Sequence, residues 1–199
     1  MTNIKILNDN LVNQIAAGEV IERPASVVKE LCENSIDSNA DNLDVEITAG
    51  GIKSIKVTDN GTGILKDDLS LSVQRHATSK IRTLEDLDSL YSLGFRGEAL
   101  ASIASVSRLR IMSATEENNA YMIEATDTNS NSELTPVAHP IGTTVLVNDL
   151  FYNTPARRKF LRTEITEYKK IEECIKLIGL VNMNTVSYTH LTLPTIPQV

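Results

Sequence analysis

The chain has 199 residues, of which 41% are hydrophobic and 23% charged, as is typical of a globular domain that needs no disulfide or metal to stay folded. The net charge of −7 argues against a duplex-binding surface spread over the whole domain, because neutralising phosphates needs clustered Lys and Arg. The lack of tryptophan and the aromatic fraction of 4% argue against a base-stacking platform for single-stranded nucleic acid.

Hydrophobic periodicity predicts a chain of mixed helices and strands. In chain order, the predicted elements are helices over 10–22 and 25–37, strands near 43–47 and 55–57, helices over 65–74, 83–90 and 98–105, strands near 106–114, 120–126 and 143–149, and a long helix near 156–180. Pro24 is well placed to open the second helix, and Gly50-Gly51 predicts a hairpin between the first two strands. Hairpin-joined strands with helices before and after predict an α+β fold, a two-layer α/β sandwich whose mixed or antiparallel sheet carries helices on one face.

The predicted domain covers residues 1–184, and residues 185–199 form a tail of different composition. The tail contains no Asp, Glu, Lys or Arg and continues no helix or sheet pattern, so we expect a truncation followed by non-native sequence. No run approaches about 18 apolar residues and the N-terminus has no apolar signal core, so we expect neither a membrane span nor a secretion leader. Cys32 and Cys174 match no zinc spacing, which indicates reduced structural thiols in a cytoplasm.

One face of the second predicted helix is polar and acidic. Glu30, Asn34 and Asp37 are separated by four and three residues, so their side chains point the same way. An amide oxygen suits Mg²⁺, which prefers oxygen ligands, and a carboxylate one turn earlier can deprotonate a water aimed at a γ-phosphate. Asn34 is therefore a candidate magnesium ligand and Glu30 a candidate general base. The alternative is an ordinary solvated helix face.

Asp59 ends the second predicted strand and is followed by a glycine-containing loop. A carboxylate only accepts hydrogen bonds, whereas the adenine N6 amine donates them, so a buried Asp here selects adenine over guanine. A mismatch at such a position costs about 1–3 kcal/mol. Gly61 and Gly63 would let the backbone approach the base closely. The alternative is a simple turn at Asn60-Gly61.

Residues 75–97 form a long polar connection, of a length that usually marks a functional lid or a disordered segment. Backbone N–H groups at the glycine-flanked start of the following helix can bind an anion, and Thr78, Ser79 and Lys80 add hydroxyls and a cation. The lid candidates at this helix start are Gly94, Phe95, Arg96, Gly97, Glu98, Ala99 and Leu100. The spacing is that of neither a P-loop nor a dinucleotide-binding fold, and the alternative is a glycine-rich turn.

A basic cluster and two histidines complete the candidates. The cluster consists of Arg157, Arg158, Lys159 and Arg162, and it is either a local basic patch or a solvated helix face. His76 and His139 match no metal or nucleophile spacing, so we expect structural histidines.

Five runs of the chain closely resemble those of the MutL family of DNA mismatch-repair proteins. They are NQIAAGEV at 13–20, ERPASVVKEL at 22–31, RHATSKI at 75–81, GFRGEAL at 94–100 and LFYNTPARRKFL at 150–161. Runs of this number and order are not expected by chance, and the resemblance extends over residues 4 to 180. It implies the Bergerat-type ATP-binding fold shared with gyrase, the large heat-shock chaperones and histidine kinases.

The resemblance also implies roles for individual residues, with ATP and Mg²⁺ as cofactors. Glu30 would be the general base and Asn34 the metal ligand, with Asp37 in the same nucleotide site. The residues implied around the adenine are Asp59, Gly61, Gly63 and Thr144, and those implied over the phosphates are Thr78, Ser79, Lys80 and residues 94–100. Residues 1–20 would help an ATP-bound homodimer form.

Three hypotheses of function remain open. The first is a slow ATPase whose turnover gates a repair complex, the second a nucleotide-dependent scaffold, and the third another ATPase of the superfamily, such as a chaperone or topoisomerase subunit. The runs at 13–20 and 150–161 favour the MutL type. That type implies a bacterial cytoplasmic protein working at the nucleoid with a mismatch-recognition protein and a downstream nuclease or helicase, while DNA contacts lie in other parts of the full-length protein.

The family continues beyond this length with a second subdomain that supplies a lysine to the γ-phosphate. We therefore expect this chain to be an N-terminal fragment with weak turnover or none.

Overall fold

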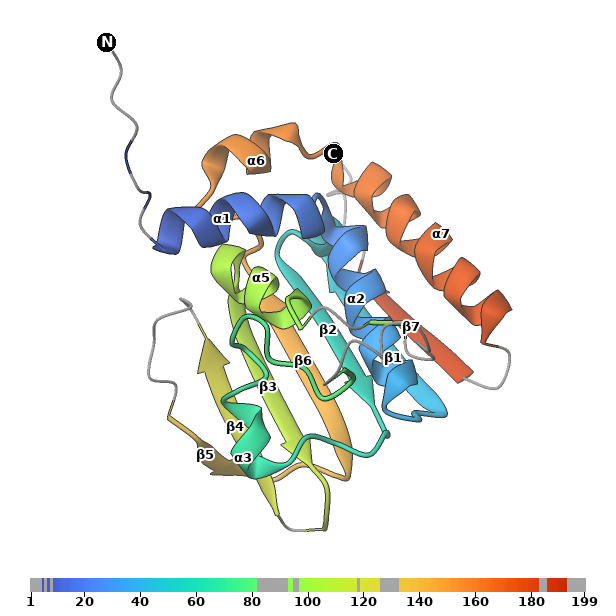
Figure 1. Ribbon diagram of the computed structural model, residues 1–199. Helices are drawn as coiled ribbons and strands as arrows, with labels where there is room; N and C mark the ends of the chain where they lie inside the picture. Colours follow the sequence, from blue (N-terminus) through green and yellow to red (C-terminus); the bar gives the residue numbers. More distant parts are fainter. Residues whose placement is uncertain are drawn as a thin grey trace.

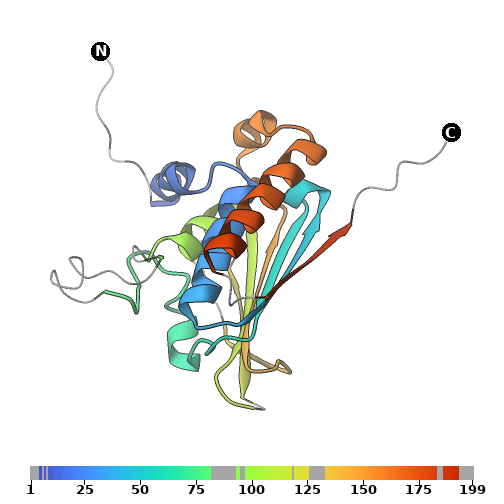
Figure 2. The same cartoon turned by 90° about the vertical axis from the view of Figure 1, so that its right-hand side faces the viewer.

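The strands described by the structure form one seven-stranded sheet in the order β5-β4-β3-β6-β2-β1-β7, and the helices cover one of its faces (Figure 1). Seen from the side, the helical layer lies on one side of the sheet (Figure 2). This computed structural model describes residues 5, 7, 9–81, 93–94, 97–117, 119–125, 133–182 and 186–192. The helix predicted over 83–90 lies outside the described residues. The two-layer α+β arrangement confirms the predicted fold class.

The strands are β1 Asn42–Thr48, β2 Ser54–Asp59, β3 Arg108–Ala114, β4 Ala120–Ala125, β5 Thr135–Val137, β6 Gly142–Asn148 and β7 Val186–Thr192. All neighbours are antiparallel except β1 and β7, which are parallel, so the sheet is mixed. The predicted hairpin joins β1 to β2, with φ of 63° at Gly50 and 84° at Gly51, values that favour glycine. β5 was not predicted, because three residues are too few to reveal an alternating pattern.

β7 lies in the segment that the sequence assigned to a tail outside the sheet. It pairs with β1 from Asn42 opposite Val186 to Thr48 opposite Thr192. The strand contains one valine and two threonines, which are β-branched and favour extended backbone. The sheet therefore extends into residues for which no strand was predicted.

The helices are α1 Asp9–Val20, α2 Pro24–Asp37, α3 Lys66–Leu69, α5 Ala99–Val106, α6 Pro155–Phe160 and α7 Glu164–Val181, with a short 3₁₀ helix, η1, at Ala49–Gly51. The helix predicted over 65–74 is only α3, followed by turns. The long helix predicted near 156–180 is divided into α6 and α7. Thr163 has an extended backbone, and its hydroxyl accepts a hydrogen bond from Thr166 N at 3.4 Å, so it caps a new helix.

The core lies between the helical layer and the inner face of the sheet, and it fixes the orientation of α2. The apolar side of α2 buries Val27, Val28, Leu31 and Cys32. Complete burial of one aliphatic side chain of this size contributes about 1.5–3 kcal/mol, so this side holds the helix on the sheet. The opposite side of α2 is left to present its polar residues.

Gly142 is the position where a side chain is least compatible with the sheet. Its φ is 123°, and an added Cβ would lie 2.1 Å from the carbonyl oxygen of Asp59 on the neighbouring strand. We expect Gly142→Ala to lower the free energy of unfolding by about 1–3 kcal/mol in urea denaturation. Gly179→Ala is the matched control, since a Cβ there meets nothing within 4 Å and an alanine favours the helix. Equal stability of the two variants would contradict this.

Cys32 makes the stability of the fold depend on pH in the alkaline range. Burial, with smaller effects of Cys174 and Glu33, raises the pKa of the Cys32 thiol from 9.0 to about 12. The neutral thiol therefore stabilises the fold fully below pH 9.0, and this contribution is lost as the pH rises toward about 12. We expect the free energy of unfolding to fall between about pH 8 and 10.5, and to fall less steeply in Cys32→Ala.

Urea denaturation at both pH values measures this slope. Cys174→Ala is the comparison, because burial also raises the pKa of that half-buried thiol. The Cys32 part of the slope should persist in Cys174→Ala. A slope unchanged by Cys32→Ala would refute the assignment.

Candidate nucleotide site

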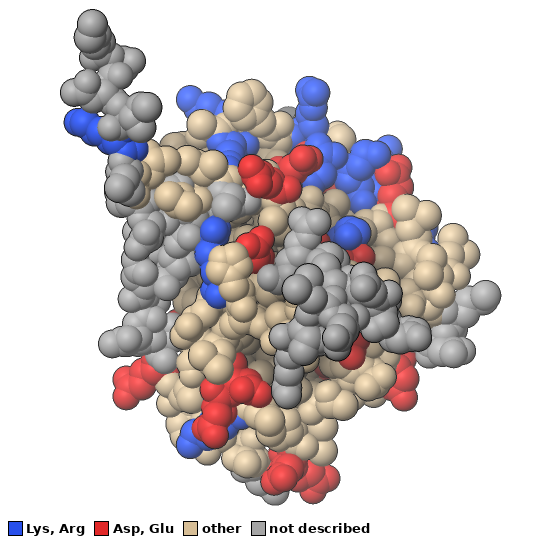
Figure 3. All heavy atoms as spheres, viewed as in Figure 1, with Lys and Arg blue, Asp and Glu red and all other residues tan. Residues whose placement is uncertain are grey.

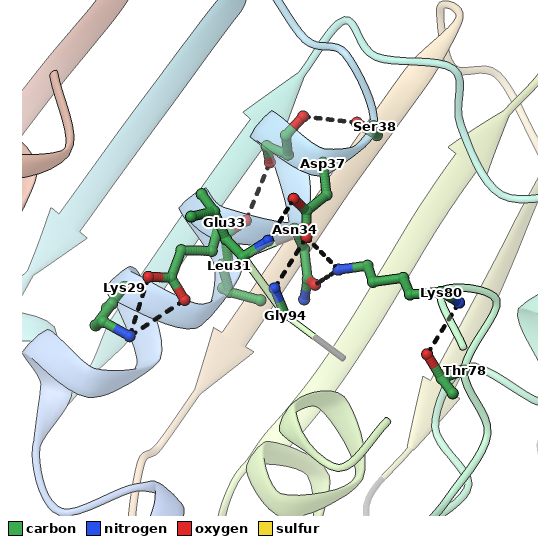
Figure 4. Close-up of polar contacts among 11 residues, drawn as sticks. Lys29, Leu31, Glu33, Asn34, Asp37, Ser38, Thr78, Lys80 and Gly94 are labelled. Carbon is green, nitrogen blue, oxygen red and sulfur yellow. Dashed lines mark hydrogen bonds and ion pairs between the residues drawn. The ribbon is translucent and has the colours of Figure 1, made fainter. Parts of the chain in front are cut away.

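The candidate site lies where the C-terminal half of α2 meets the end of β2 and the connection that carries Thr78 and Lys80. Figure 4 shows the polar side of α2, with Asn34 and Asp37 turned toward Lys80 and Gly94. Sequence reasoning assigned all four of these residues to one site, and the structure brings them together.

Asp59 is a buried carboxylate held in one orientation by three donors. It is 8% exposed at the end of β2. Its Oδ2 accepts from Ser35 Oγ at 2.8 Å, and its Oδ1 accepts from Gly61 N at 3.0 Å and from Thr143 N at 3.2 Å. Because a carboxylate has about four acceptor positions, these three bonds leave capacity for one further donor. A purine amine is a donor of that kind.

Thr143, and not Thr144, lies beside Asp59. Thr143 is opposite Asp59 in the pairing of β2 with β6, and its hydroxyl shares a hydrogen bond of 2.9 Å with Ser113 Oγ. Since successive side chains of a strand point to opposite faces, Thr144 faces away from the helices. Its hydroxyl contacts Thr58 at 3.1 Å and His139 at 2.7 Å. The structure therefore does not bring Thr144, which the resemblance placed around the base, to the carboxylate.

Gly61 and Gly63 allow two backbone segments to approach each other. A Cβ on Gly61 would lie 2.0 Å from Ser38 Oγ, and one on Gly63 would lie 2.1 Å from the carbonyl oxygen of Ala114. Gly63 also has a φ of 74°. These contacts with the protein itself are sufficient to require both glycines, and they place the loop after β2 firmly between α2 and β3.

Asp37 joins α2 to two parts of the connection. Its Oδ2 accepts from Lys80 Nζ at 2.5 Å and from Gly94 N at 3.1 Å, and its Oδ1 accepts from Leu93 N at 2.9 Å. Lys80 Nζ also donates to Asn34 Oδ1 at 3.0 Å. Asn34 and Asp37 thus present oxygens to a cation, which is the donor chemistry that Mg²⁺ requires.

Glu30 lies one turn before Asn34, with its side chain 26% exposed. Lys29 Nζ is 3.9 Å from Glu30 Oε1 but only 3.0 Å from Glu33 Oε1, so Glu33 is the main partner of this lysine. The hydrogen bond with Glu33 raises the pKa of Lys29. Glu30 lies four residues before Asn34, on the same side of α2.

The remaining lid candidates lie near the two ends of the connection over residues 75–97. Thr78 Oγ1 accepts from Lys80 N at 3.2 Å, and Ser79 is exposed. Gly97 has a φ of 62°, and a Cβ there would lie 2.6 Å from the carbonyl oxygen of Ala77. Glu98 lies 3.4 Å from His76 Nδ1, and α5 begins at the next residue. The candidates Ala99 and Leu100 form the first turn of α5, whereas Phe95 and Arg96 lie outside the described residues.

The basic cluster lies on α6 and the residues after it, away from Asp59. Lys and Arg side chains gather over this end of the molecule (Figure 3). Arg157 turns toward α1, and its Nη2 donates to the carbonyl oxygen of Ile15 at 3.4 Å. Arg158, Lys159 and Arg162 are exposed. The cluster is therefore not part of the nucleotide site.

Sequence reasoning missed two residues that orient Asp59. Ser35 is 4% exposed within the apolar side of α2, and Thr143 is 7% exposed at the start of β6. A serine in an otherwise apolar helix stripe is a signal that could have identified Ser35, because a buried hydroxyl needs a partner. Thr143 could not be separated from Thr144 without the strand register.

Among the residues that the structure describes, no group of three or more His, Cys, Asp or Glu side chains is placed to hold a metal. No described helix is both long and apolar enough to cross a bilayer.

Comparison with known proteins finds relatives that match most of this chain. Residues 21–149 match the family described as histidine kinase-, DNA gyrase B- and HSP90-like ATPase. The DNA mismatch repair protein MutL of Escherichia coli (strain K12) is 57% identical over 189 residues, which cover 94% of this chain and 31% of that protein.

Two solved structures are similar along most of the chain. The N-terminal domain of a DNA repair protein is 31% identical, with a TM-score of 0.78, over 92% of this chain and 53% of that one. The Aquifex aeolicus MutL ATPase domain complexed with ADP is 37% identical, with a TM-score of 0.69, over 86% of this chain and 61% of that one. The chain spans only 31% of the length of the curated MutL relative.

Proposed function

The chain belongs to the histidine kinase-, DNA gyrase B- and HSP90-like ATPase family, and on that premise we propose that it is the ATP-binding and slowly hydrolysing region of a MutL-type DNA mismatch-repair protein. The single observation that carries the proposal is the buried Asp59 carboxylate, fixed by three donors, one of which is Ser35 of α2. Similarity to MutL ATPase domains along most of the chain supports the repair assignment.

In this proposal Asp59 binds the adenine amine, and Thr143 and Gly61 hold the carboxylate in place. A guanine would present an oxygen acceptor to the same carboxylate, which leaves both acceptors unpaired and costs about 1–3 kcal/mol. The geometry therefore favours adenine by orientation as well as by charge, because Asp59 cannot turn away without breaking its bonds to the backbone.

Glu30 is the proposed general base, and Asn34 and Asp37 are the residues that would hold Mg²⁺. Bound there, the metal ion would neutralise charge on the phosphates. Glu30 takes a proton from the attacking water, one helical turn from the metal-binding oxygens. Lys80 and the backbone N–H groups around Gly94 and Gly97 are the proposed phosphate contacts of the lid.

At the level of the whole protein, we propose a nucleotide-switched matchmaker between mismatch recognition and strand removal. Its partners would be a mismatch-recognition protein and a downstream nuclease or helicase, and ATP would promote a homodimer. An alternative is a scaffold that binds nucleotide without significant hydrolysis. Measured ATP turnover separates the two.

Calorimetry on the chain tests the binding step. With MgCl₂ present, we expect ADP and a non-hydrolysable ATP analogue to bind, and GDP to bind at least about tenfold more weakly. Lack of ADP binding would refute the nucleotide site. Equal affinity for ADP and GDP would leave Asp59 without its proposed role.

A further inference from the structure

The Lys80 ammonium lies at the point where α2 offers two oxygens. Lys80 Nζ is 3.0 Å from Asn34 Oδ1 and 2.5 Å from Asp37 Oδ2, and Figure 4 shows the side chain reaching across to both. The Asp37 side chain is 8% exposed and that of Lys80 is 23% exposed. Partial burial strengthens such charge-assisted contacts relative to those of a surface pair.

Gly94 lies close to the Lys80 ammonium and to both oxygens that it contacts. A Cβ added at Gly94 would lie 3.2 Å from Lys80 Nζ, 3.6 Å from Asn34 Oδ1 and 3.8 Å from Asp37 Oδ2. The Gly94 backbone also donates to the oxygen of Asp37 that Lys80 contacts. A lysine ammonium is a compact positive charge that carries donors only. Like a small metal cation, it is therefore stabilised by nearby oxygen atoms.

We propose that the Lys80 ammonium and a divalent cation are alternative occupants of the Asn34–Asp37 oxygen pair. Lys80 then has two positions. In the first position, it neutralises the Asp37 carboxylate and holds the connection against α2. In the second position, it is released because a divalent cation binds these oxygens instead. Metal loading and the position of the Lys80 side chain are thereby coupled, since a cation shifts the equilibrium only through its preference for one of the two arrangements.

This inference rests on the proposed function only for the assignment of Asn34 and Asp37 as the residues that would hold a metal, and it does not require that a nucleotide binds. The competition itself concerns three side chains and can be measured without nucleotide. Mn²⁺ is a suitable probe, because it accepts the same oxygen ligands as Mg²⁺ and free Mn²⁺ is quantified directly by electron paramagnetic resonance.

Lys80→Met removes the competing charge while keeping a flexible side chain of similar length. We expect the affinity of the nucleotide-free chain for Mn²⁺ to rise at least about tenfold, because a unit charge a few ångströms from the metal is removed. Lys56→Met is the matched control: Lys56 makes a 2.6 Å ion pair with Glu46, and its loss changes the net charge equally. Its Mn²⁺ affinity should match that of the unmodified chain.

Adding Asn34→Ala to Lys80→Met tests whether the gain in Mn²⁺ affinity arises at the Asn34–Asp37 oxygen pair. The double variant should return to the Mn²⁺ affinity of the unmodified chain. Unaltered affinity in Lys80→Met, or a gain that survives Asn34→Ala, would overturn the proposal.

The outcomes also separate this inference from the proposed function. If the unmodified chain binds ADP but Lys80→Met gains no Mn²⁺ affinity, only the inference fails. If Lys80→Met gains the affinity while no nucleotide binds to the unmodified chain, only the proposed function fails.

Discussion

Replacing Glu30 by alanine should lower ATP turnover by a factor of about 10²–10⁴ while leaving ATP affinity within about twofold, since a positioned base contributes to the chemical step and not to binding. Glu30 lies one turn before Asn34 on a helix whose apolar side is packed on the sheet, so its position relative to the proposed metal ligands Asn34 and Asp37 does not depend on the lid. Phosphate release under single-turnover conditions measures the step directly, and calorimetry measures the affinity.

Two further variants make this result specific. Glu33→Ala removes a carboxylate from the same helix, where Glu33 is the main partner of Lys29, and it should retain turnover within a few-fold. Glu30→Gln keeps the shape but cannot accept a proton, so it should behave as Glu30→Ala does. Turnover that is unchanged in Glu30→Gln would remove Glu30 from the chemistry.

The second large effect is expected on binding, in Asp59→Asn. The amide oxygen can keep the bonds from Gly61 N and Thr143 N, but the amide nitrogen then presents a donor where the adenine amine also donates. Placing two donors against each other costs about 1–3 kcal/mol, which corresponds to roughly 5- to 150-fold weaker ATP binding. Calorimetry at constant Mg²⁺ gives the affinity.

Asp149→Asn is the control for Asp59→Asn. Asp149 contacts Lys53 and Arg108, is itself partly exposed, and lies outside the site. It should leave ATP affinity unchanged. A thermal unfolding curve for both variants shows whether weakened binding reflects the site or the fold. Unaltered ATP affinity in a well-folded Asp59→Asn variant would show that the adenine does not bind at Asp59.

The sequence predicted much of the fold because its main helices and strands have strong periodic patterns. α2 shows why: its apolar and polar sides separate at helical spacing, and both the packing side and the functional side follow from that spacing. The division of α6 from α7 was missed because a capping threonine inside a long amphipathic stretch has no marked effect on the pattern. Thr163 is recognised as a helix cap only from its extended backbone in the structure.

Within the site, residues that act through local spacing were predictable and those that act through register were not. Asn34 and Asp37 share one helix face, and that prediction required no knowledge of the rest of the chain. Their contact with Lys80 joins distant parts of the sequence and is visible only in the structure. The choice between Thr143 and Thr144 depends on which of two adjacent residues faces the helices. A shift of one residue reverses that answer, and only the pairing of β2 with β6 fixes it.

The parallel pairing of β7 with β1 has a consequence for how this chain is handled. β1 would otherwise be the outermost strand on its side, with a row of backbone N–H and C=O groups open to any extended segment nearby. Shortening the chain to residue 184 would uncover that row along seven residues and invite self-association in concentrated samples. Retaining the last strand protects the domain against aggregation through this edge.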